Sequence, residues 1–93
     1  MTAQQFLIFV QCRPGKTKEI ALAVIKRRFR YVEQVLSISG KWDLLIRIKI
    51  SDDKEVESDI IEPLFEGLWD DVIRTKTIIA YNVFDPEDSF IED

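Results

Sequence analysis

The sequence contains no histidine and only one cysteine, Cys12, among its 93 residues. Histidine is the commonest acid–base group at neutral pH and a frequent metal ligand, so its absence argues against many hydrolytic and metal centres. A single cysteine cannot form an internal disulfide, and without histidine it has no partner to activate it as a nucleophile. We therefore expect a cytoplasmic, non-enzymatic protein without a metal or cofactor, in which Cys12 is a small buried hydrophobe.

Long apolar runs and glycine-rich loops are missing as well. No stretch of about 18 apolar residues is long enough for a membrane span, and no signal-peptide pattern precedes the first strand. The three glycines form no phosphate-cradling loop. The acidic pairs Asp52-Asp53 and Asp70-Asp71 have ligands for a hard cation, but adjacent acids at helix ends are usually solvated.

Charge is distributed very unevenly along the chain. Residues 1–50 contain ten Lys and Arg against three Asp and Glu, a net +7, whereas residues 51–93 contain three against fourteen, a net −11. The densest basic run is Lys26–Arg30. This run fits either a nucleic-acid-binding surface or a set of cations that complement the C-terminus of a helix. The net negative charge of the whole chain favours the second reading.

Four segments have the pattern of sheet strands: 6–12, 32–39, 42–50 and 72–83. In the third, Trp42, Leu44, Ile46, Ile48 and Ile50 alternate with Asp43, Leu45, Arg47 and Lys49, which predicts two distinct faces. In the first strand, Phe6, Ile8 and Val10 point one way and Leu7 and Phe9 the other. The strands therefore carry apolar residues on both faces.

Two helices are expected between these strands. The first runs from about residue 16 or 17 to 28, and its apolar arc is wider than one sheet face requires, so part of it is expected to meet another subunit. The second runs from about 54 to 68, with a kink or break near Glu62 because Pro63 cannot donate a backbone hydrogen bond. Its expected buried residues are Val56, Ile60, Ile61, Leu64, Phe65 and Leu68.

The order βαββαβ predicts a ferredoxin-like α+β fold, with a four-stranded antiparallel sheet and both helices on one face. We expect one domain at 1–84 and an acidic tail at 85–93. Helices on one side leave the other apolar side of the sheet uncovered, and a large exposed apolar patch is rare in a monomer. We therefore predict an obligate dimer, a dimeric α/β barrel with two sheets packed face to face.

The segment 31–50, YVEQVLSISGKWDLLIRIKI, resembles the strand–turn–strand of the ligand-binding (RAM) domain of Lrp/AsnC-family transcription regulators. The turn Ser39-Gly40-Lys41-Trp42-Asp43 matches the family's Thr/Ser-Gly-x-Tyr/Phe-Asp, and Thr75-Lys76-Thr77 matches its fourth strand. The resemblance spans about residues 5–82. The chain has no counterpart of the family's helix-turn-helix domain, and in this it resembles the stand-alone form. It also has Asp71 at a position where the family usually has glycine.

The resemblance implies an amino-acid site between dimers, formed by the turn and the fourth strand. Asp43 is then expected to pair with the ligand's ammonium, while backbone N–H groups near Gly40 and hydroxyls receive its carboxylate. Each residue also has a structural reading, as a turn glycine, a cap or a packing residue. The predicted ligand-binding residues are Ser39, Gly40, Trp42, Asp43, Thr75, Thr77 and Ile78.

Three functions compete. The leading one is an amino-acid-binding module that forms homodimers and higher oligomers and modulates full-length Lrp/AsnC regulators, without membrane or DNA contact. The alternative is a small dimeric α/β-barrel enzyme of the monooxygenase type, an analogy of fold alone. The third, nucleic-acid binding through the run at 26–30, predicts a steep salt dependence.

Overall fold

The structure, a computed structural model, describes residues 4–50 and 55–80. The predicted acidic tail at 85–93, residues 81–83 of the predicted fourth strand and Asp52-Asp53 lie outside the described residues. Strands β1 (Gln4–Cys12), β2 (Val32–Ser37), β3 (Leu44–Ile50) and β4 (Val72–Ala80) pair in an antiparallel sheet with the order β2-β3-β1-β4.

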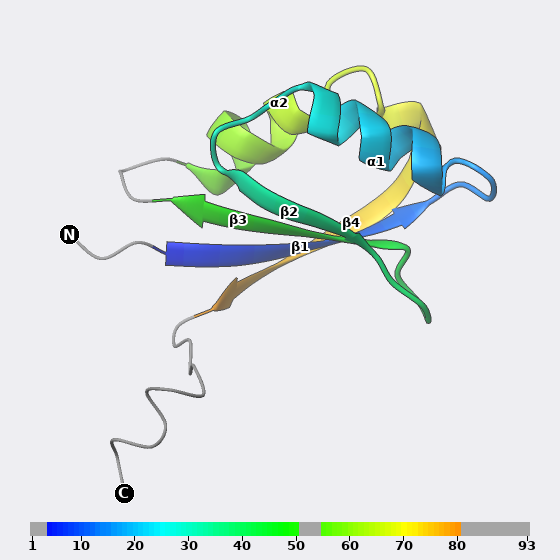
Figure 1. The fold of residues 1–93 in the computed structure, drawn as a ribbon, viewed down its shortest axis with the longest axis horizontal. Helices are drawn as coiled ribbons and strands as arrows, with labels where there is room; N and C mark the ends of the chain where they lie inside the picture. Colours follow the sequence, from blue (N-terminus) through cyan, green and yellow to red (C-terminus); the bar gives the residue numbers. More distant parts are fainter. Residues whose placement is uncertain (1–3, 51–54, 81–93) are drawn as a thin grey trace, which may run out of the picture.

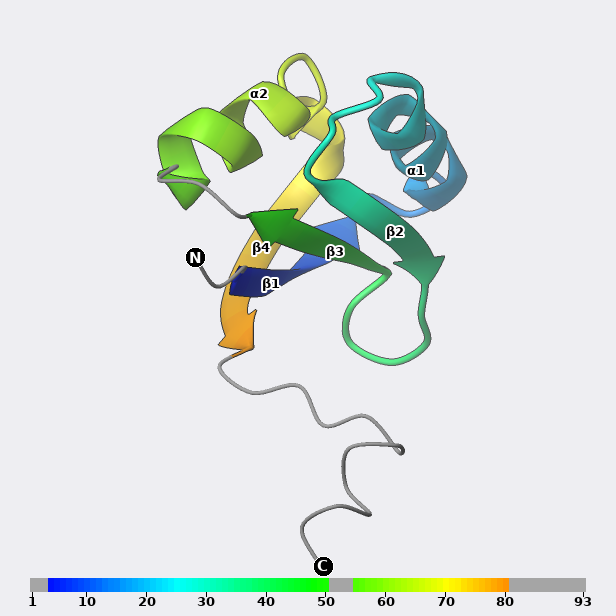
Figure 2. The ribbon, with the colours of Figure 1, turned by 60° about the vertical axis from the view of Figure 1, so that its left-hand side comes forward.

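Helix α1 (Thr17–Lys26) connects β1 to β2, and a second helical segment connects β3 to β4. That segment consists of a π-helical turn η1 (Val56–Ile61), the short α2 (Glu62–Leu64) and a 3₁₀ turn η2 (Trp69–Asp71). Both helical parts lie on the same side of the sheet (Figures 1 and 2). The predicted ferredoxin-like βαββαβ fold is confirmed, whereas its closure into a dimeric barrel stays a prediction.

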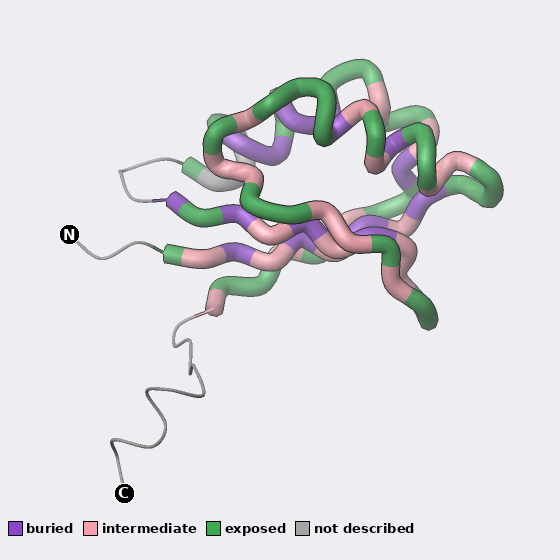
Figure 3. Tube along the Cα trace, viewed as in Figure 1, coloured by how far each residue is buried: buried purple, intermediate pink, exposed green. Residues whose placement is uncertain are grey.

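The core lies between this helical layer and the sheet, and burial alternates along the strands (Figure 3). Strand β3 shows the pattern most clearly, because Leu44, Ile46, Ile48 and Ile50 are buried while the residues between them are not. Fully burying each of these side chains contributes about 1.5–3 kcal/mol. The other buried apolar residues are Phe6, Ile8, Val10, Cys12, Ile20, Val24, Ile60, Ile61, Leu64, Phe65 and Val72.

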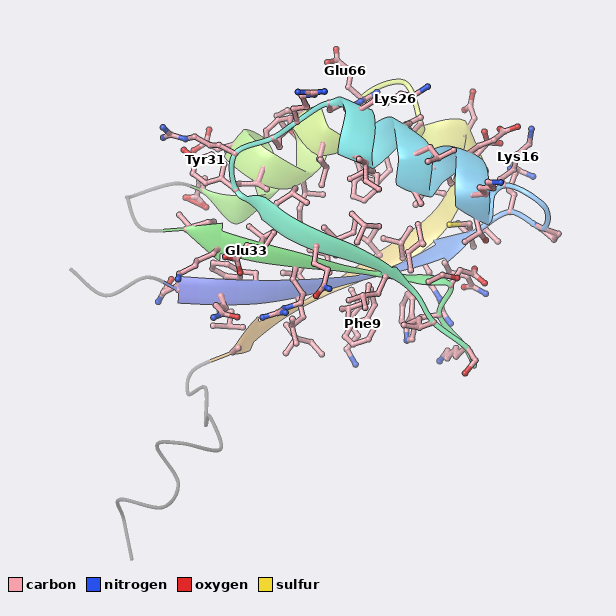
Figure 4. All side chains as sticks on the ribbon, in the orientation of Figure 1. Phe9, Lys16, Lys26, Tyr31, Glu33 and Glu66 are labelled. Atoms are coloured by element: carbon pink, nitrogen blue, oxygen red, sulfur yellow. The ribbon has the colours of Figure 1, made fainter. Side chains whose placement is uncertain are left out.

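The opposite side of the sheet, which we call the open face, is not covered by a helix. Phe9 points away from the helical layer in Figure 4 and is only half-buried. The strand register places Leu7 beside Arg47 and Ile78, and Phe9 beside Leu45 and Lys76. The predicted two-faced β1 is therefore confirmed.

The second helical segment departs from a regular α-helix, as Pro63 predicts. Proline has no N–H to donate and its ring crowds the preceding turn. The chain changes from the wider π turn to α-helix at Glu62, next to this proline. The helix ends at Leu64, earlier than the predicted residue 68, and Gly67 with φ +79° turns the chain. Ile60, Ile61, Leu64 and Phe65 are buried and Leu68 is half-buried; the side chain of Val56 is outside the description.

Arg27 joins the two helical parts. One of its terminal nitrogens, Nη1, donates to the carbonyl oxygens of Pro63 (2.9 Å) and Leu64 (2.7 Å), and Nη2 donates to that of Glu66. These carbonyls lie at the C-terminal end of α2, where backbone oxygens have no intrahelical partner. Lys26 lies in the last turn of α1, as the second reading of the basic run predicts, and Arg27 in addition caps α2, which was not predicted.

Helix α1 ends at Lys26, two residues before the predicted end. Arg28 adopts φ 52°, in the left-handed region that a helix terminus usually gives to glycine. Arg30 stacks on the ring of Tyr31, with its guanidinium carbon 4.8 Å from the ring centroid. Within residues 4–50 and 55–80, no helix is both long and apolar enough to cross a membrane.

Candidate functional site

The loop between β2 and β3 carries four of the predicted ligand residues. It extends away from the helical layer in both ribbon views (Figures 1 and 2). Ser39 and Gly40 are exposed, and Gly40 has φ +104°. A Cβ at Gly40 would meet no atom within 4 Å, so the backbone conformation rather than crowding favours glycine there.

Asp43 holds the end of this loop against β1. Its backbone N–H donates to the carbonyl of Val10 (2.9 Å), and its carboxylate Oδ2 accepts the N–H of Cys12 (2.7 Å). Cys12 lies where the β1–β4 register shifts, so its amide needs a partner other than a regular ladder. The structural reading of Asp43 as a local cap therefore holds.

Trp42 lies on the open face, where its ring centroid is 6.0 Å from that of Phe9. The prediction that Trp42 shares a face with Leu44 and Ile46 is wrong. The physical reason is that β3 begins only at Leu44, so the alternation does not extend back into the loop. Trp42 is half-buried by these contacts.

Arg74, which we did not predict as a site residue, connects this loop to β4. Its guanidinium carbon lies 4.9 Å from the centroid of Trp42, and its Nε donates to Oε1 of Gln11 (2.8 Å). The cation–aromatic contact and the hydrogen bond together fix the side chain across β1. The sequence carried one signal for it: Arg74 alternates with Thr75 and therefore lies on the same face as Lys76 and Ile78.

The β4 candidates lie on opposite faces of the sheet. Thr75 pairs with Val10 and Thr77 with Ile8, so both hydroxyls lie on the helical side of an edge strand and are half-buried. Ile78 pairs with Leu7 on the open face and is 38% exposed. The structure thus brings Trp42 and the strand β4 together but does not enclose all seven predicted residues in one cavity.

Two surface hollows among the described residues lie elsewhere. A groove of about 250 Å³ runs between α1 and β2, and a second hollow lies beside Pro63 and Trp69. No predicted ligand residue lines either one. The β2–β3 loop and β4 thus take no part in these two hollows. The groove is lined by Val24, Ile25, Arg28, Phe29, Val32, Glu33, Gln34 and Val35.

Metal binding finds no support in the part of the chain that the structure describes. No group of three or more Cys, Asp or Glu side chains is arranged there to hold an ion. The backbone carbonyls of Asp70 and Asp71 accept hydrogen bonds from Nε and N–H of Arg13, so this acidic pair takes part in joining β1 to η2.

Cys12 is buried, as expected, and burial raises the pKa of its thiol; Asp43 and Asp71 raise it further, while a hydrogen bond with Thr17 lowers it. Because the pKa is higher in the folded state, the group stabilises the fold fully below its unfolded pKa, and this contribution is lost as pH rises through the folded pKa. The thiol therefore stays protonated at neutral pH.

We expect the free energy of unfolding to fall more steeply above about pH 9 in the wild type than in Cys12→Ala. Urea unfolding of both proteins between pH 7 and pH 10 measures this difference. The two proteins differ only at residue 12, so contributions from the rest of the chain cancel in the comparison. Parallel pH curves would contradict the prediction.

No protein-family model and no curated protein sequence matches the chain. Solved structures do match. TTHA0845 from Thermus thermophilus is 21% identical with a TM-score of 0.72, over 88% of this chain and 98% of that one. An AsnC-family transcriptional regulator from Agrobacterium tumefaciens is 13% identical with a TM-score of 0.70, over 90% of this chain and 54% of that one.

The transcriptional regulator NMB0573 from Neisseria meningitidis, solved as a complex with L-Met, is 18% identical with a TM-score of 0.68. The match covers 88% of this chain and 52% of the regulator. This chain has the fold of one half of an AsnC-type regulator. At these identities the likeness establishes the fold, which agrees with the resemblance drawn from the motifs.

Proposed function

We propose that the chain is an amino-acid-binding and oligomerisation module of the Lrp/AsnC type, which modulates transcription regulators and neither binds DNA nor catalyses a reaction. Two independent lines support this proposal. The turn motif at 39–43 resembles the family's ligand turn, and the fold matches half of regulators of which one was solved with L-Met.

The observation that carries the proposal is the meeting of the β2–β3 loop with β4 at one end of the sheet. Asp43 is fixed there by two hydrogen bonds to β1, and Trp42 and Arg74 connect loop and strand over the open face. A zwitterionic amino acid suits this end of the sheet. The carboxylate of Asp43 attracts the ammonium of the amino acid, while N–H groups and hydroxyls of the loop donate hydrogen bonds to its carboxylate.

The site is open in the single chain, and this links binding to assembly. A second copy supplies the missing wall, so an amino acid binds the assembled form more tightly than the free chain. By linkage, the ligand then shifts the equilibrium towards assembly by its difference in affinity for the two states. The exposed Leu22 (45%) and Ile25 (53%) on α1 offer a further contact for higher oligomers.

Isothermal titration with the twenty amino acids tests the binding. We expect at least one to bind, and Asp43→Asn to weaken it by about 10- to 100-fold, because a charge-assisted hydrogen bond contributes roughly 1.5–3 kcal/mol. Asparagine is the matched change, since its side-chain oxygen still accepts the N–H of Cys12. Light scattering with and without the bound amino acid measures the change in assembly.

Asp43→Ala is the less specific variant, because it removes the cap of Cys12 together with the charge. Urea unfolding separates the two effects: we expect Asp43→Asn to keep most of the stability that Asp43→Ala loses. Absence of binding by every amino acid, or equal binding by wild type and Asp43→Asn, would contradict the proposed site.

A further inference from the structure

The open face is basic as well as apolar. Arg47 and Lys49 lie on β3, and Arg74 and Lys76 on β4, on either side of β1. Their side-chain neighbours across the strands are glutamines or apolar residues. Among the described residues, none of these four cations forms an ion pair; Arg47 donates to Gln34 and Arg74 to Gln11.

On this face the apolar residues of β1 lie between the cations of β3 and those of β4; we call the β3 and β4 sides of β1 the flanks, although β3 also pairs with β2. The register gives the rows Arg47–Leu7–Ile78 and Leu45–Phe9–Lys76, with Leu36 next to Leu45. A second copy that covers the apolar middle would bring its own four cations to the same place. Like charges opposed across a sheet are destabilising, so the flanks need carboxylates from another part of the molecule.

The chain contains such carboxylates immediately after β4. Residues 81–93 include five Asp and Glu and no Lys or Arg, together with Phe84, Phe90 and Ile91. Strand β4 ends at Ala80, which pairs with Gln5, and Gln5 pairs with Lys49 on its other side. The first of these acids, Asp85, therefore comes five positions after the row of the open face that contains Lys49.

The length of this segment is sufficient for the contact. Thirteen residues reach at most about 45 Å when extended, whereas a nine-residue strand such as β1 is about 30 Å long. The segment can therefore reach every cation of the open face, on its own chain or on a second copy.

We propose that the acidic segment 85–93 binds along the basic flanks of the open face, with its carboxylates against Lys49, Lys76 and the neighbouring arginines. The contact neutralises the flanks and leaves the apolar middle for a second copy. It depends on the charge of the open face and not on amino-acid binding. Its strength falls as salt rises, because exposed ion pairs are screened.

Zero-length carbodiimide coupling of carboxylates to amines, followed by proteolysis and mass spectrometry, tests the contact on the full chain. We expect residues 85–93 to couple to Lys49 and Lys76 roughly fivefold more than to Lys18 and Lys26, and the preference to vanish at about 1 M salt, where the Debye length is about 3 Å. Lys18 and Lys26 are matched controls, being exposed amines on α1.

A second measurement compares amine acetylation in the wild type and in a variant with the acids neutralised: D85N, E87Q, D88N, E92Q and D93N. We expect Lys49 and Lys76 to react roughly threefold faster in the variant and Lys18 and Lys26 to be unchanged. Mixing chains with and without ¹⁵N label assigns each coupled pair to one chain or two.

Two results would overturn the proposal: coupling spread evenly over all four lysines, or coupling of Lys49 and Lys76 to the acids of the helical segment 55–66 instead of 85–93. Light scattering on the same sample reports the assembly state independently. If the protein is monomeric and shows the expected coupling, the dimer is wrong and the contact of 85–93 with the open face stands. If it is dimeric and shows no such coupling, the contact is wrong and the dimer stands.

Discussion

Replacing Arg27 by alanine is expected to lower the free energy of unfolding by about 2–3 kcal/mol, although the side chain is on the surface. The guanidinium donates to three carbonyl oxygens at the end of α2, those of Pro63, Leu64 and Glu66. Charged hydrogen bonds to backbone oxygens are stronger than neutral ones, and these also oppose the negative end of the helix. Urea unfolding followed by far-UV circular dichroism measures the change.

The adjacent arginine provides the matched control. Arg28 has φ 52°, a conformation that costs a non-glycine residue about 1–2 kcal/mol. Arg28→Gly relieves that strain and also makes the unfolded chain more flexible, so we expect a gain of at most about 1 kcal/mol. Both variants lose one positive charge, and equal effects of both would contradict the specific role of Arg27.

Arg27→Lys refines the test. Lysine keeps the charge but lacks the planar guanidinium group, which donates to several carbonyls at once. We expect it to recover less than half of the stability lost in Arg27→Ala. Full recovery by lysine would mean that the charge alone stabilises the end of α2.

Much of the fold was predictable because burial imposes a simple periodicity. Ile46 and Ile48 face the helices and Arg47 and Lys49 do not, as period two requires of a sheet that is packed on one side. Pro63 likewise predicted the irregular second helix, because a proline lacks its N–H in any context and this can be known from the sequence alone. Such signals need no knowledge of distant residues.

The boundaries and the long-range contacts were not predictable in the same way. In the sequence the alternation begins at Trp42, but the N–H of Asp43 donates to the carbonyl of Val10 and the strand starts at Leu44. Which side Trp42 takes depends on Phe9 and Arg74, residues 33 and 32 positions away. Periodicity carries no information about contacts at that separation.

The candidate site shows the same division. The turn motif drew attention to Gly40 and Asp43, and the structure gives both residues a conformational or hydrogen-bonding role. Arg74 escaped notice because a basic residue on a strand is usually solvated. Only the strand register and the contacts of the folded chain show that Arg74 reaches Gln11 and the loop.

Phe9→Lys is expected to raise the dissociation constant of the proposed dimer by at least about 10³-fold. Phe9 is half-buried in the middle of the open face beside Leu45, Lys76 and Trp42. Each copy would lose about 2 kcal/mol of apolar burial, so a symmetric dimer loses about twice that, and every 1.4 kcal/mol corresponds to a factor of ten. The new ammonium adds a fifth cation to a face that already has four.

The folded chain itself should tolerate this change, because Phe9 contributes nothing to the core between sheet and helices. We expect a native far-UV spectrum together with the light-scattering mass of a single chain. Leu22→Lys, at an exposed apolar position on α1, is the matched control and should leave the dimer intact. If Phe9→Lys still dimerises, or if Leu22→Lys does not, the proposed interface on the open face is wrong and the helical layer forms the interface instead.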